Sequence, residues 1–328
     1  MMDKITISPA PPDLPGLVWH PIGRGDLAAV VDLAHACLRA DGGLHFLFVP
    51  DVVQNRFFPD TPGAGIGAFD ADQRLGACVT VHLDGDASPQ RATLTGYVRP
   101  DLRRQGLGTY LMHWGQAQAQ ALFTEAAVDQ RLLRIATESL TEPAHRLYLA
   151  HGFASVSEDW MMRRDLHQPL PPTGHPLPER VTLATWGPET AGQFFQAYHA
   201  AFRDRPGFPN PSAEQWIDGV NGNDLVTEWT LLGLEGDQPM GFVIGALGDL
   251  TASPPDGYLV QIGVVPEARR RGLASAVIVE ALRRMQASGA PCAHLQVHTN
   301  NPGAIQAYAG LGFVTIARRV RYERIAEQ

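Results

Sequence analysis

The apolar and polar positions follow one succession of periods in the first half of the chain and repeat it in the second. In the first half, residues 17–22 have the composition of a strand, and residues 25–40 place apolar residues at helical spacing. Three strand-like segments follow, separated by turn residues, at 65–71, 75–84 and 92–98. The remaining elements are a helix, a strand, a short helix and a last strand, at 104–123, 131–139, 142–151 and from 154.

The second half begins in the same way, with a strand at 180–186 and a helix at 188–203. Its later elements are a second helix, three strands, a long helix, a strand, a short helix and a last strand, at 212–220, 229–235, 240–248, 258–265, 270–288, 293–300, 302–312 and 313–325. Strands and helices in this order predict an α/β fold in which helices flank a mixed sheet. Because the order occurs twice, we expect a tandem repeat.

A proline-rich segment separates the two halves. Residues 166–179 read LHQPLPPTGHPLPE, and prolines at this density disfavour both helix and central strand. We therefore predict an N-terminal domain at 1–166, a linker at 167–179 and a C-terminal domain at 180–328. The length of 328 residues also favours two domains over a single core.

Composition narrows the class of partner. Apolar residues make up 45% of the chain, enough for two cores, and the net charge is −8. A nucleic acid is therefore not expected as a partner, because a phosphate backbone requires a basic protein face. A local basic pocket for a small phosphorylated ligand remains compatible with this charge.

The cysteines and the apolar runs indicate an intracellular protein. Cys37, Cys78 and Cys292 lie far apart and form no CxxC pair, which predicts reduced thiols and neither a disulfide framework nor a metal site. The first residues lack the basic and apolar regions of a signal peptide, and the chain has no apolar run of membrane-spanning length. We expect a cytoplasmic location and no membrane partner.

One short motif recurs at matching places in the two halves. Residues 102–108 read LRRQGLG and residues 268–274 read ARRRGLA, each where a strand is followed by a long helix. Unpaired N–H groups at the start of a helix, a glycine that admits close approach, and arginine side chains together can bind a diphosphate. For either copy alone, an arginine-rich surface helix start is an equal alternative. Dinucleotide and P-loop motifs are disfavoured, because the third glycine of GxGxxG and the GK[ST] ending are missing.

The residues before each copy extend the match to V-x-P-x-x-R-x-x-G-x-[GA]. The pattern is met by two sets: Val98, Pro100, Arg103, Gly106 and Gly108, and Val264, Pro266, Arg269, Gly272 and Ala274. This resembles the acyl-CoA signature of the GNAT superfamily of N-acetyltransferases. The resemblance implies that two segments bind acetyl-CoA, comprising Val98, Arg103, Arg104, Gln105, Gly106, Leu107, Gly108 and Thr109, and Val264, Val265, Arg269, Arg270, Arg271, Gly272, Leu273, Ala274 and Ser275.

A second signature follows in each half. Tyr148 precedes a Gly-Phe pair in AHRLYLAHGF, and Tyr308 precedes one in AIQAYAGLGF. These segments resemble the superfamily's closing helix, in which a tyrosine lies near the sulfur of CoA, although a tyrosine on a short helix taken alone is more often a core residue. The resemblance covers nearly the whole chain. It implies two tandem GNAT folds, each with a mixed, mostly antiparallel central sheet flanked by helices, and acetyl-CoA as donor with no metal.

The implied reaction is direct attack of an acceptor amine on the thioester. Backbone N–H groups near Val98 or Val264 would stabilise the oxyanion, and Tyr148 or Tyr308 would act as the acid at the leaving thiolate. Many relatives carry a glutamate on the strand before the cradle, but neither strand here contains a carboxylate. Glu138 and His298 occupy equivalent places and are the candidate bases; the alternative is that both are ordinary polar strand ends.

The two halves differ at one position that matters for this chemistry. Superfamily members often have asparagine seven residues before the tyrosine, where its amide can bind the pantetheine arm. The second half has Asn301 there and the first has Thr141. We therefore expect the C-terminal half to be the better catalyst, and the N-terminal half to bind CoA with weaker turnover or to serve as a scaffold.

The acceptor is predicted only by class, as a primary amine on a small molecule or peptide. Aromatic residues after the first helices form either an acceptor wall or part of the core: Phe46, Phe48, Phe57, Phe58, Phe208 and Trp216. A binding protein, such as an acyl-CoA sensor or pseudoenzyme, is the alternative function. The retained tyrosines favour an enzyme, because binding alone has little use for an acid at the sulfur.

Overall fold

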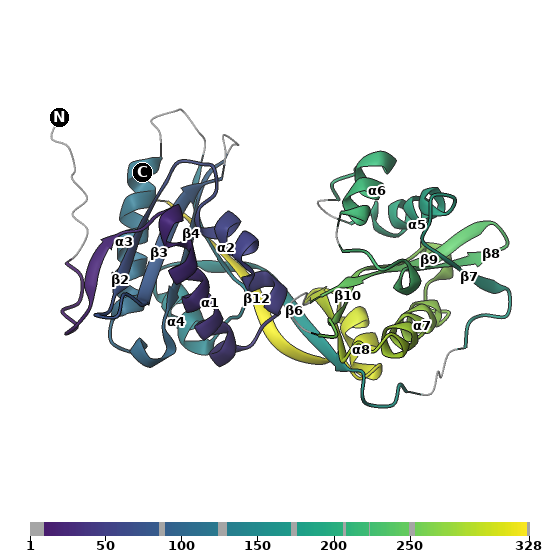
Figure 1. The fold of residues 1–328 in the computed structure, drawn as a ribbon. Helices are drawn as coiled ribbons and strands as arrows, with labels where there is room; N and C mark the ends of the chain where they lie inside the picture. Colours follow the sequence, from purple (N-terminus) through teal and green to yellow (C-terminus); the bar gives the residue numbers. More distant parts are fainter. Residues whose placement is uncertain are drawn as a thin grey trace. The chain divides into compact units, whose positions relative to one another are not determined.

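The computed structural model describes residues 10–84, 89–123, 130–171, 176–205, 208–222, 224–248 and 253–326. Two compact units are present: unit 1 comprises Met1–Trp160 with Ala317–Gln328, and unit 2 comprises Met161–Ile316. Both consist of helices packed on a sheet (Figure 1). Residues 172–175 of the predicted linker lie outside the described residues, and its described residues form neither helix nor strand.

The sheet of unit 1 is mixed and mostly antiparallel. Its strands lie in the order β1 (Val18–Pro21), β2 (Gly63–Phe69), β3 (Leu75–Leu83), β4 (Gln90–Val98), β5 (Arg131–Thr137) and β12 (Val314–Ile325). Every neighbouring pair is antiparallel except β4 and β5, which are parallel. Four helices accompany these strands: α1 (Leu27–Asp41), α2 (Pro50–Phe57), α3 (Leu107–Leu122) and α4 (Glu142–Ala150).

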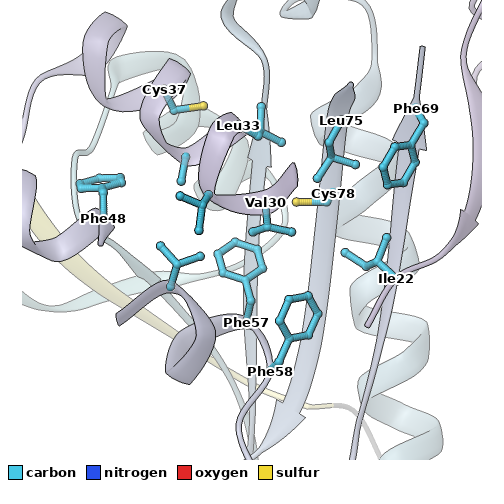
Figure 2. Packing of buried hydrophobic residues seen from close by; sticks show 13 residues of the cluster. Ile22, Val30, Leu33, Cys37, Phe48, Phe57, Phe58, Phe69, Leu75 and Cys78 are labelled. Atoms are coloured by element: carbon cyan, nitrogen blue, oxygen red, sulfur yellow. The ribbon is translucent and has the colours of Figure 1, made fainter. Parts of the chain in front are cut away.

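Helices cover both faces of this sheet, as the alternation along β3 shows. Cys78 belongs to the same buried cluster as residues of α1 and α2, including Val30 and Phe57 (Figure 2). Ala77 and Val79, the neighbours of Cys78, instead belong to the cluster that contains residues of α3. Because successive side chains of a strand point to opposite faces, α1 and α2 cover one face and α3 the other. All nine residues of β3 are buried accordingly.

Unit 2 repeats this arrangement. Its strands lie in the order β6 (Ala154–Asp165), β11 (Cys292–His298), β10 (Gly257–Val264), β9 (Gln238–Leu247), β8 (Leu231–Glu235) and β7 (Val181–Thr185), and β10 and β11 are parallel. Its helices are α5 (Ala191–Phe202), α6 (Ala213–Asn221), α7 (Leu273–Ala287) and α8 (Pro302–Gly310). The predicted order of elements and the fold class are thus confirmed; α2 was not predicted. Among the described residues, every helix is too short or too polar to cross a lipid bilayer.

Part of the last strand of each repeat belongs to the other unit: most of β12, but only residues 161–165 of β6. Residues 317–325 of β12 lie in unit 1, where Val320 pairs with Thr137 and Tyr322 with Ile135 of β5. Met161 and Met162, at the end of β6, are buried in unit 2. The predicted domain boundaries at 1–166 and 180–328 follow the two repeats along the sequence and stay a prediction. The compact units are divided differently: the first segment of unit 1 ends at Trp160, and unit 1 also contains the end of the second repeat, from Ala317. Burial accounts for the exchange, because Val320 and Tyr322 are 1% and 0% exposed.

Cutting the chain in the linker should therefore leave its two pieces associated. We expect a protease site inserted within 167–179 to give, after cleavage, two fragments that elute together in size-exclusion chromatography. They should separate only in denaturant, because residues 317–325 of one fragment complete the sheet of unit 1. Fragments that separate under native conditions would contradict the exchange.

Candidate functional site

The recurring motif folds into the same loop in both units. In unit 1 a short 3-10 turn, Pro100–Leu102, leads from β4 to α3; in unit 2 the turn Pro266–Ala268 leads from β10 to α7. We name residues 103–109 cradle 1 and residues 269–275 cradle 2. Each cradle contains a left-handed arginine followed by a left-handed glycine, with φ of 67° and 84° in cradle 1 and 61° and 76° in cradle 2.

These backbone angles shape a concavity of the kind that can bind an anion. Arg104 and Arg270 adopt a conformation that costs a non-glycine residue about 1–2 kcal/mol, and both do so at the same repeat position. Gly106 and Gly272 are the N-caps of α3 and α7, and neither helix start has a side-chain cap. The first N–H groups of each helix therefore have no intrahelical partner, and the helix dipole adds positive potential there.

Cradle 1 has glycine, which lacks a side chain, at positions 106 and 108. A Cβ atom added at Gly106 would have no neighbour within 4 Å, so glycine is required there by φ rather than by space. A Cβ at Gly108 would lie 3.1 Å from Leu147 Cδ2 of α4. Cradle 2 has Ala274 at the position equivalent to Gly108. Beneath the cradles, Leu107 and Leu273 are buried.

The first arginine of each cradle anchors the loop. Both Arg103 nitrogens Nη1 and Nη2 donate to Asp41 at 2.7 Å, and Nε donates to Val98 O at 3.2 Å. Arg269 Nε likewise donates to Val264 O at 3.2 Å, and its Nη2 donates to Ala201 O at 3.1 Å. Each guanidinium thus ties the end of a strand to the first helix of its unit, and this contact occupies donors that the sequence analysis expected to face the ligand.

The second arginine is placed to bind an anion. Arg104 and Arg270 are exposed, and within the described part of the chain neither side chain forms a hydrogen bond or an ion pair. In cradle 2 the third arginine, Arg271, lies 3.5 Å from Glu235. The exposed Gln105 and Thr109 in cradle 1 and the half-buried Ser275 in cradle 2 complete the predicted binding sets. The two arginines of the motif therefore divide into an anchor and a free cation.

A gap opens between β4 and β5 beside cradle 1. The parallel pairing ends at Leu94 and Ile135, while β4 continues to Val98. The Arg99 N–H donates to Gly76 O on the β3 side. Because bonding alternates along an antiparallel pair, Gly96 and Val98 direct their N–H groups away from β3 and into the gap.

A cavity of about 540 Å³ fills this gap in unit 1. Its lining includes residues 94–98 of β4, residues 135–139 at and after the end of β5, and six cradle residues: Arg103, Arg104, Gly106, Leu107, Gly108 and Thr109. Tyr148 lines it as well, which brings the two predicted signatures of the first half to one cavity. The cavity therefore extends from cradle 1 to Tyr148, past the backbone N–H groups of Gly96 and Val98.

Unit 2 has the equivalent gap with one difference. The β10–β11 pairing ends at Leu259 and Leu295, and the β9–β10 register shifts between Leu259 and Gln261. Val260 is thus a bulge residue in β10, whereas β4 pairs with β3 without a shift. Bulges leave a residue outside the ladder and increase local twist. Val264 and Val265, both predicted to bind the ligand, lie where β10 ends and the loop begins.

The two candidate acids are both held as neutral phenols. Tyr148 lies on α4 and Tyr308 on α8, at equivalent positions. Burial raises the pKa of each to about 12. Tyr322 adds to the shift at Tyr148, and Arg205 opposes it at Tyr308. A phenol with this pKa keeps its proton at neutral pH and so can donate a hydrogen bond to a developing thiolate.

Thr141 and Asn301, which distinguish the halves, share a structural role. Thr141 Oγ1 accepts from the Ala144 N–H at 3.4 Å, and Asn301 Oδ1 accepts from the Ala304 N–H at 3.3 Å. Each residue is the N-cap of its closing helix. With its oxygen used by the cap, Asn301 still has an amide nitrogen with two donors, while threonine retains only one hydroxyl proton.

The candidate base of unit 1 is ion-paired. Glu138 is 5% exposed and lines the cavity; Arg56 Nη2 lies 3.5 Å from its Oε1, and Arg319 Nε lies 2.8 Å from its Oε2. Arg56 also donates to Tyr97 Oη at 3.1 Å and to Leu47 O at 2.8 Å. Glu138 is thus part of a buried charge network rather than an isolated carboxylate.

The candidate base of unit 2 lies in a different setting. His298 is half-buried at the end of β11, and its Nδ1 accepts a hydrogen bond from the Asn300 N–H at 3.2 Å. That bond places the proton of a neutral ring on Nε2. The base therefore remains a prediction in both units, with the more open position in unit 2.

Most of the aromatic residues considered for an acceptor wall are core residues. Phe48, Phe57 and Phe58 belong to the cluster between α1, α2 and the sheet (Figure 2), although Phe48 also borders the cavity. Trp216 is buried in the corresponding cluster of unit 2, and Phe208 packs against it.

Several site residues were missed by the sequence analysis. Asp41 and Cys37 reach cradle 1 from α1: Asp41 holds Arg103, and the Cys37 thiol donates to Val98 O at 3.5 Å. Burial raises the pKa of Cys37 to about 11, so this donor stays protonated. In the sequence, Asp41 was notable only because it lies before Gly42 at the end of a predicted helix. That position indicates where the helix ends, but it does not identify Arg103 as a partner.

A cluster in unit 2 has the donor types of a metal site. Ligand atoms of Asp256, Cys292 and His294 lie within 4.8 Å of one another. Hydrogen bonds account for their proximity, with Cys292 Sγ and Asp256 Oδ2 lying 3.2 and 3.0 Å from His294 Nε2. Burial raises the pKa of Cys292 to about 12, and Arg163, which also bonds Cys292, opposes this rise with its positive charge. The pKa of Asp256 is lowered, because the bond from His294 and the charge of Arg163 outweigh its burial. That positive charge opposes a bound cation, and the cluster lies at the opposite end of β11 from the gap.

Two family models match the chain. The model of the acetyltransferase (GNAT) family matches residues 192–313, and that of an acetyltransferase (GNAT) domain matches residues 63–155. Each match includes one cradle and one of the two tyrosines.

Relatives and solved structures match nearly the full length. The mycothiol acetyltransferase of Parafrankia sp. is 29% identical over 325 residues, which covers 92% of this chain and 95% of the relative. That of Thermobispora bispora is 28% identical over 309 residues, covering 92% and 96%. A GCN5-related N-acetyltransferase from Sphaerobacter thermophilus has a TM-score of 0.69 at 24% identity, covering 97% and 98%. A tandem GNAT protein from the clavulanic acid biosynthesis pathway has a TM-score of 0.62 at 18% identity, covering 95% and 99%.

The division of the arginines predicts different effects on stability. We expect Arg103→Ala to lower the free energy of unfolding by about 1.5–3 kcal/mol, because it leaves Asp41 without its charged donor. Arg104→Ala, the matched control one residue away, should change it by less than about 0.5 kcal/mol. Denaturant titration of both variants measures this. Equal losses for the two would contradict the assignment of anchor and free cation.

Proposed function

Because the chain carries two GNAT domains in tandem and so belongs to the GNAT family of acetyltransferases, we propose that it transfers an acetyl group from acetyl-CoA to a primary amine by direct attack. The observation that carries this is the cradle built twice, each time after a strand whose parallel partner ends early, together with the cavity that brings cradle 1 and Tyr148 together in unit 1. Cradles 1 and 2 would bind the diphosphate of CoA, with Arg104 and Arg270 as the free cations.

The pantetheine arm would enter the gap and pair with the strand. In unit 1 the N–H groups of Gly96 and Val98 face the gap and are available to the arm and to the thioester oxygen. Backbone donors of this kind stabilise the oxyanion that forms when an amine attacks a carbonyl. Collapse of the tetrahedral intermediate breaks the C–S bond, and the thiolate leaves beside the tyrosine hydroxyl, which donates a hydrogen bond to it. The amine loses a proton in the process, to His298 in unit 2 or to water.

We assign the main turnover to unit 2. The bulge at Val260 takes one residue of β10 out of the ladder beside the gap, a feature that β4 lacks. Asn301 offers an amide donor where unit 1 has Thr141, and Glu138, the candidate base of unit 1, is held by two arginines. These three differences favour the C-terminal domain as the catalyst.

A second function is favoured for unit 1. Glu138 is enclosed by Arg56 and Arg319, so a proton transfer to it would disrupt two ion pairs. Unit 1 would then bind acyl-CoA in its cavity with little or no turnover, as a sensor or pseudoenzyme does. The two functions are compatible, since each belongs to a different unit.

The acceptor is proposed from the relatives. Two of them that cover over nine tenths of this chain are mycothiol acetyltransferases, at 28–29% identity. We propose that the acceptor is a small-molecule amine, as we infer for these relatives. The reaction would take place in the cytoplasm, where acetyl-CoA is available.

Charge added to the cradles should remove one binding site at a time. Thr109 and Ser275 are the third residues of α3 and α7, at equivalent positions. Glutamate there is favourable to the helix dipole but repels a diphosphate. We expect calorimetric titration with acetyl-CoA to give two sites for the original chain and one for Thr109→Glu or Ser275→Glu. No binding to the original chain would overturn the proposed function.

The tyrosines should differ in their effect on turnover. We expect Tyr308→Phe to lower kcat about 100-fold, the lower end of the usual range for a general acid, and Tyr148→Phe to lower it less than threefold. Steady-state assays that detect free CoA would measure this. The reverse order would assign catalysis to unit 1.

The pH dependence follows from the raised pKa of Tyr308. Its acid form persists below a pKa of about 12, so kcat should not fall between about pH 7 and pH 10. Raising the pH over this range also increases the fraction of the acceptor amine that is neutral. We therefore expect kcat/KM to rise until the pH reaches the pKa of the acceptor amine. A fall in kcat within this range would show that Tyr308 is not the acid.

A further inference from the structure

The strand that unit 1 receives from the second repeat reaches the tyrosine of the cavity. Tyr322 of β12 is 0% exposed, and its ring meets the ring of Tyr148 at a centroid distance of 5.1 Å and an interplanar angle of 60°. Its hydroxyl lies 2.6 Å from His145 Nδ1. Edge-to-face geometry of this kind is the preferred arrangement of two aromatic rings.

These contacts fix one face of α4. His145 and Tyr148 are three residues apart and therefore lie on the same side of the helix. At the helix end, Arg324 Nη1 of the same strand donates to His151 O at 2.9 Å. A single strand thus holds α4 at three successive positions, and Tyr148 is the central one.

At the equivalent positions of unit 2, the tyrosine and the histidine are replaced by apolar residues. The sequence repeat has an offset of 160 residues from Tyr148 to Tyr308, which makes Met162 the counterpart of Tyr322 and Ile305 the counterpart of His145. The polar pair of unit 1 is therefore replaced by an apolar pair. The counterpart of Arg324 is Arg164, which lies beside Gly312, where an added Cβ would be 3.0 Å from Arg164 Cζ. Both units therefore place an arginine beside the glycine that follows the closing helix, Arg324 at Gly152 and Arg164 at Gly312, while the tyrosine–histidine bond belongs to unit 1.

We propose that Tyr322 is a positioning residue that directs the Tyr148 hydroxyl at the sulfur of CoA bound in unit 1. The inference rests on the proposed function, because it requires CoA in this cavity with its sulfur at Tyr148. The T-shaped contact restricts the tilt of the Tyr148 ring, and the hydroxyl–histidine bond in turn fixes Tyr322. The second repeat thereby supplies a residue of the site in the first.

A hydrogen bond to the sulfur has a measurable signature. A donor favours the thiolate over the thiol, so it lowers the pKa of the bound CoA thiol relative to the same cavity without that donor, whereas burial alone raises a thiol pKa above its free value of about 8.5. The thiolate absorbs in the ultraviolet and the thiol does not, so a pH titration of the complex reports this pKa. A change that only loosened the fold would alter the affinity for CoA without moving the pKa of the bound fraction.

The experiment uses the full chain with Ser275→Glu, so that CoA occupies unit 1 alone. We expect Tyr148→Phe to raise the pKa of the bound thiol by about one unit. Tyr322→Leu should raise it by a similar amount, and Tyr322→Phe, which keeps the ring and loses the bond to His145, should raise it by less. Met162→Leu, the repeat counterpart, is the control and should leave it unchanged. Affinity for CoA should stay within threefold of the parent for each.

The outcomes separate the two levels of the proposal. A shift for Tyr148→Phe with none for either Tyr322 variant overturns the positioning role and leaves the proposed function standing. No shift for Tyr148→Phe overturns the role of Tyr148 itself, and with it the inference. If Tyr322→Leu fails to fold, Tyr322→Phe and His145→Gln decide: a shift in both supports the inference, and none in either overturns it.

Discussion

In each unit, two parallel strands separate before they end, and the site is built where they do so. Up to Leu94 and Leu259 the backbone donors of β4 and β10 have a strand partner; beyond them, alternate N–H groups face a gap. Buried backbone donors require partners, so a gap of this kind is stable only where something else can bond to them. The cavity, the cradle and the closing helix surround this gap in unit 1, and each contributes one group suited to a long ligand with a diphosphate at one end.

Holding the gap open needs rigid edges, and the arginines provide them. Arg103 and Arg269 each bond the carbonyl at the end of a strand and a residue of the first helix, at 3.2 Å to the strand in both units. This bond fixes where the strand turns into the cradle. The neighbouring Arg104 and Arg270 are then left in a left-handed conformation with their side chains exposed. One arginine of each pair thus anchors the loop, and the adjacent arginine is the one proposed to bind the ligand.

The two units share the gap, the cradle and the anchoring arginine, and they differ in the residues around them. The exchange of β6 and β12 means that each unit contains a segment of the other repeat, and residues such as Arg319 and Tyr322 act on a site far from their own repeat in sequence. Glu138 is enclosed by ion pairs in unit 1, while unit 2 has a half-buried histidine and a strand bulge. A repeated frame with separate details allows one unit to specialise in turnover and the other in binding.

The sequence by itself determined the order of elements, the tandem repeat, the cradles and the closing helices with their tyrosines. These follow from short-range physics: apolar periodicity, proline and glycine placement, and motif spacing are properties of neighbouring residues. Only the tertiary structure decided which arginine is an anchor, that Asn301 and Thr141 are helix caps, that Glu138 is ion-paired, and that the last strands are exchanged. Each of these depends on residues such as Asp41 or Arg319 that are distant in sequence. A charge or an aromatic ring has no periodicity that identifies its partner, so folding alone brings the pair together.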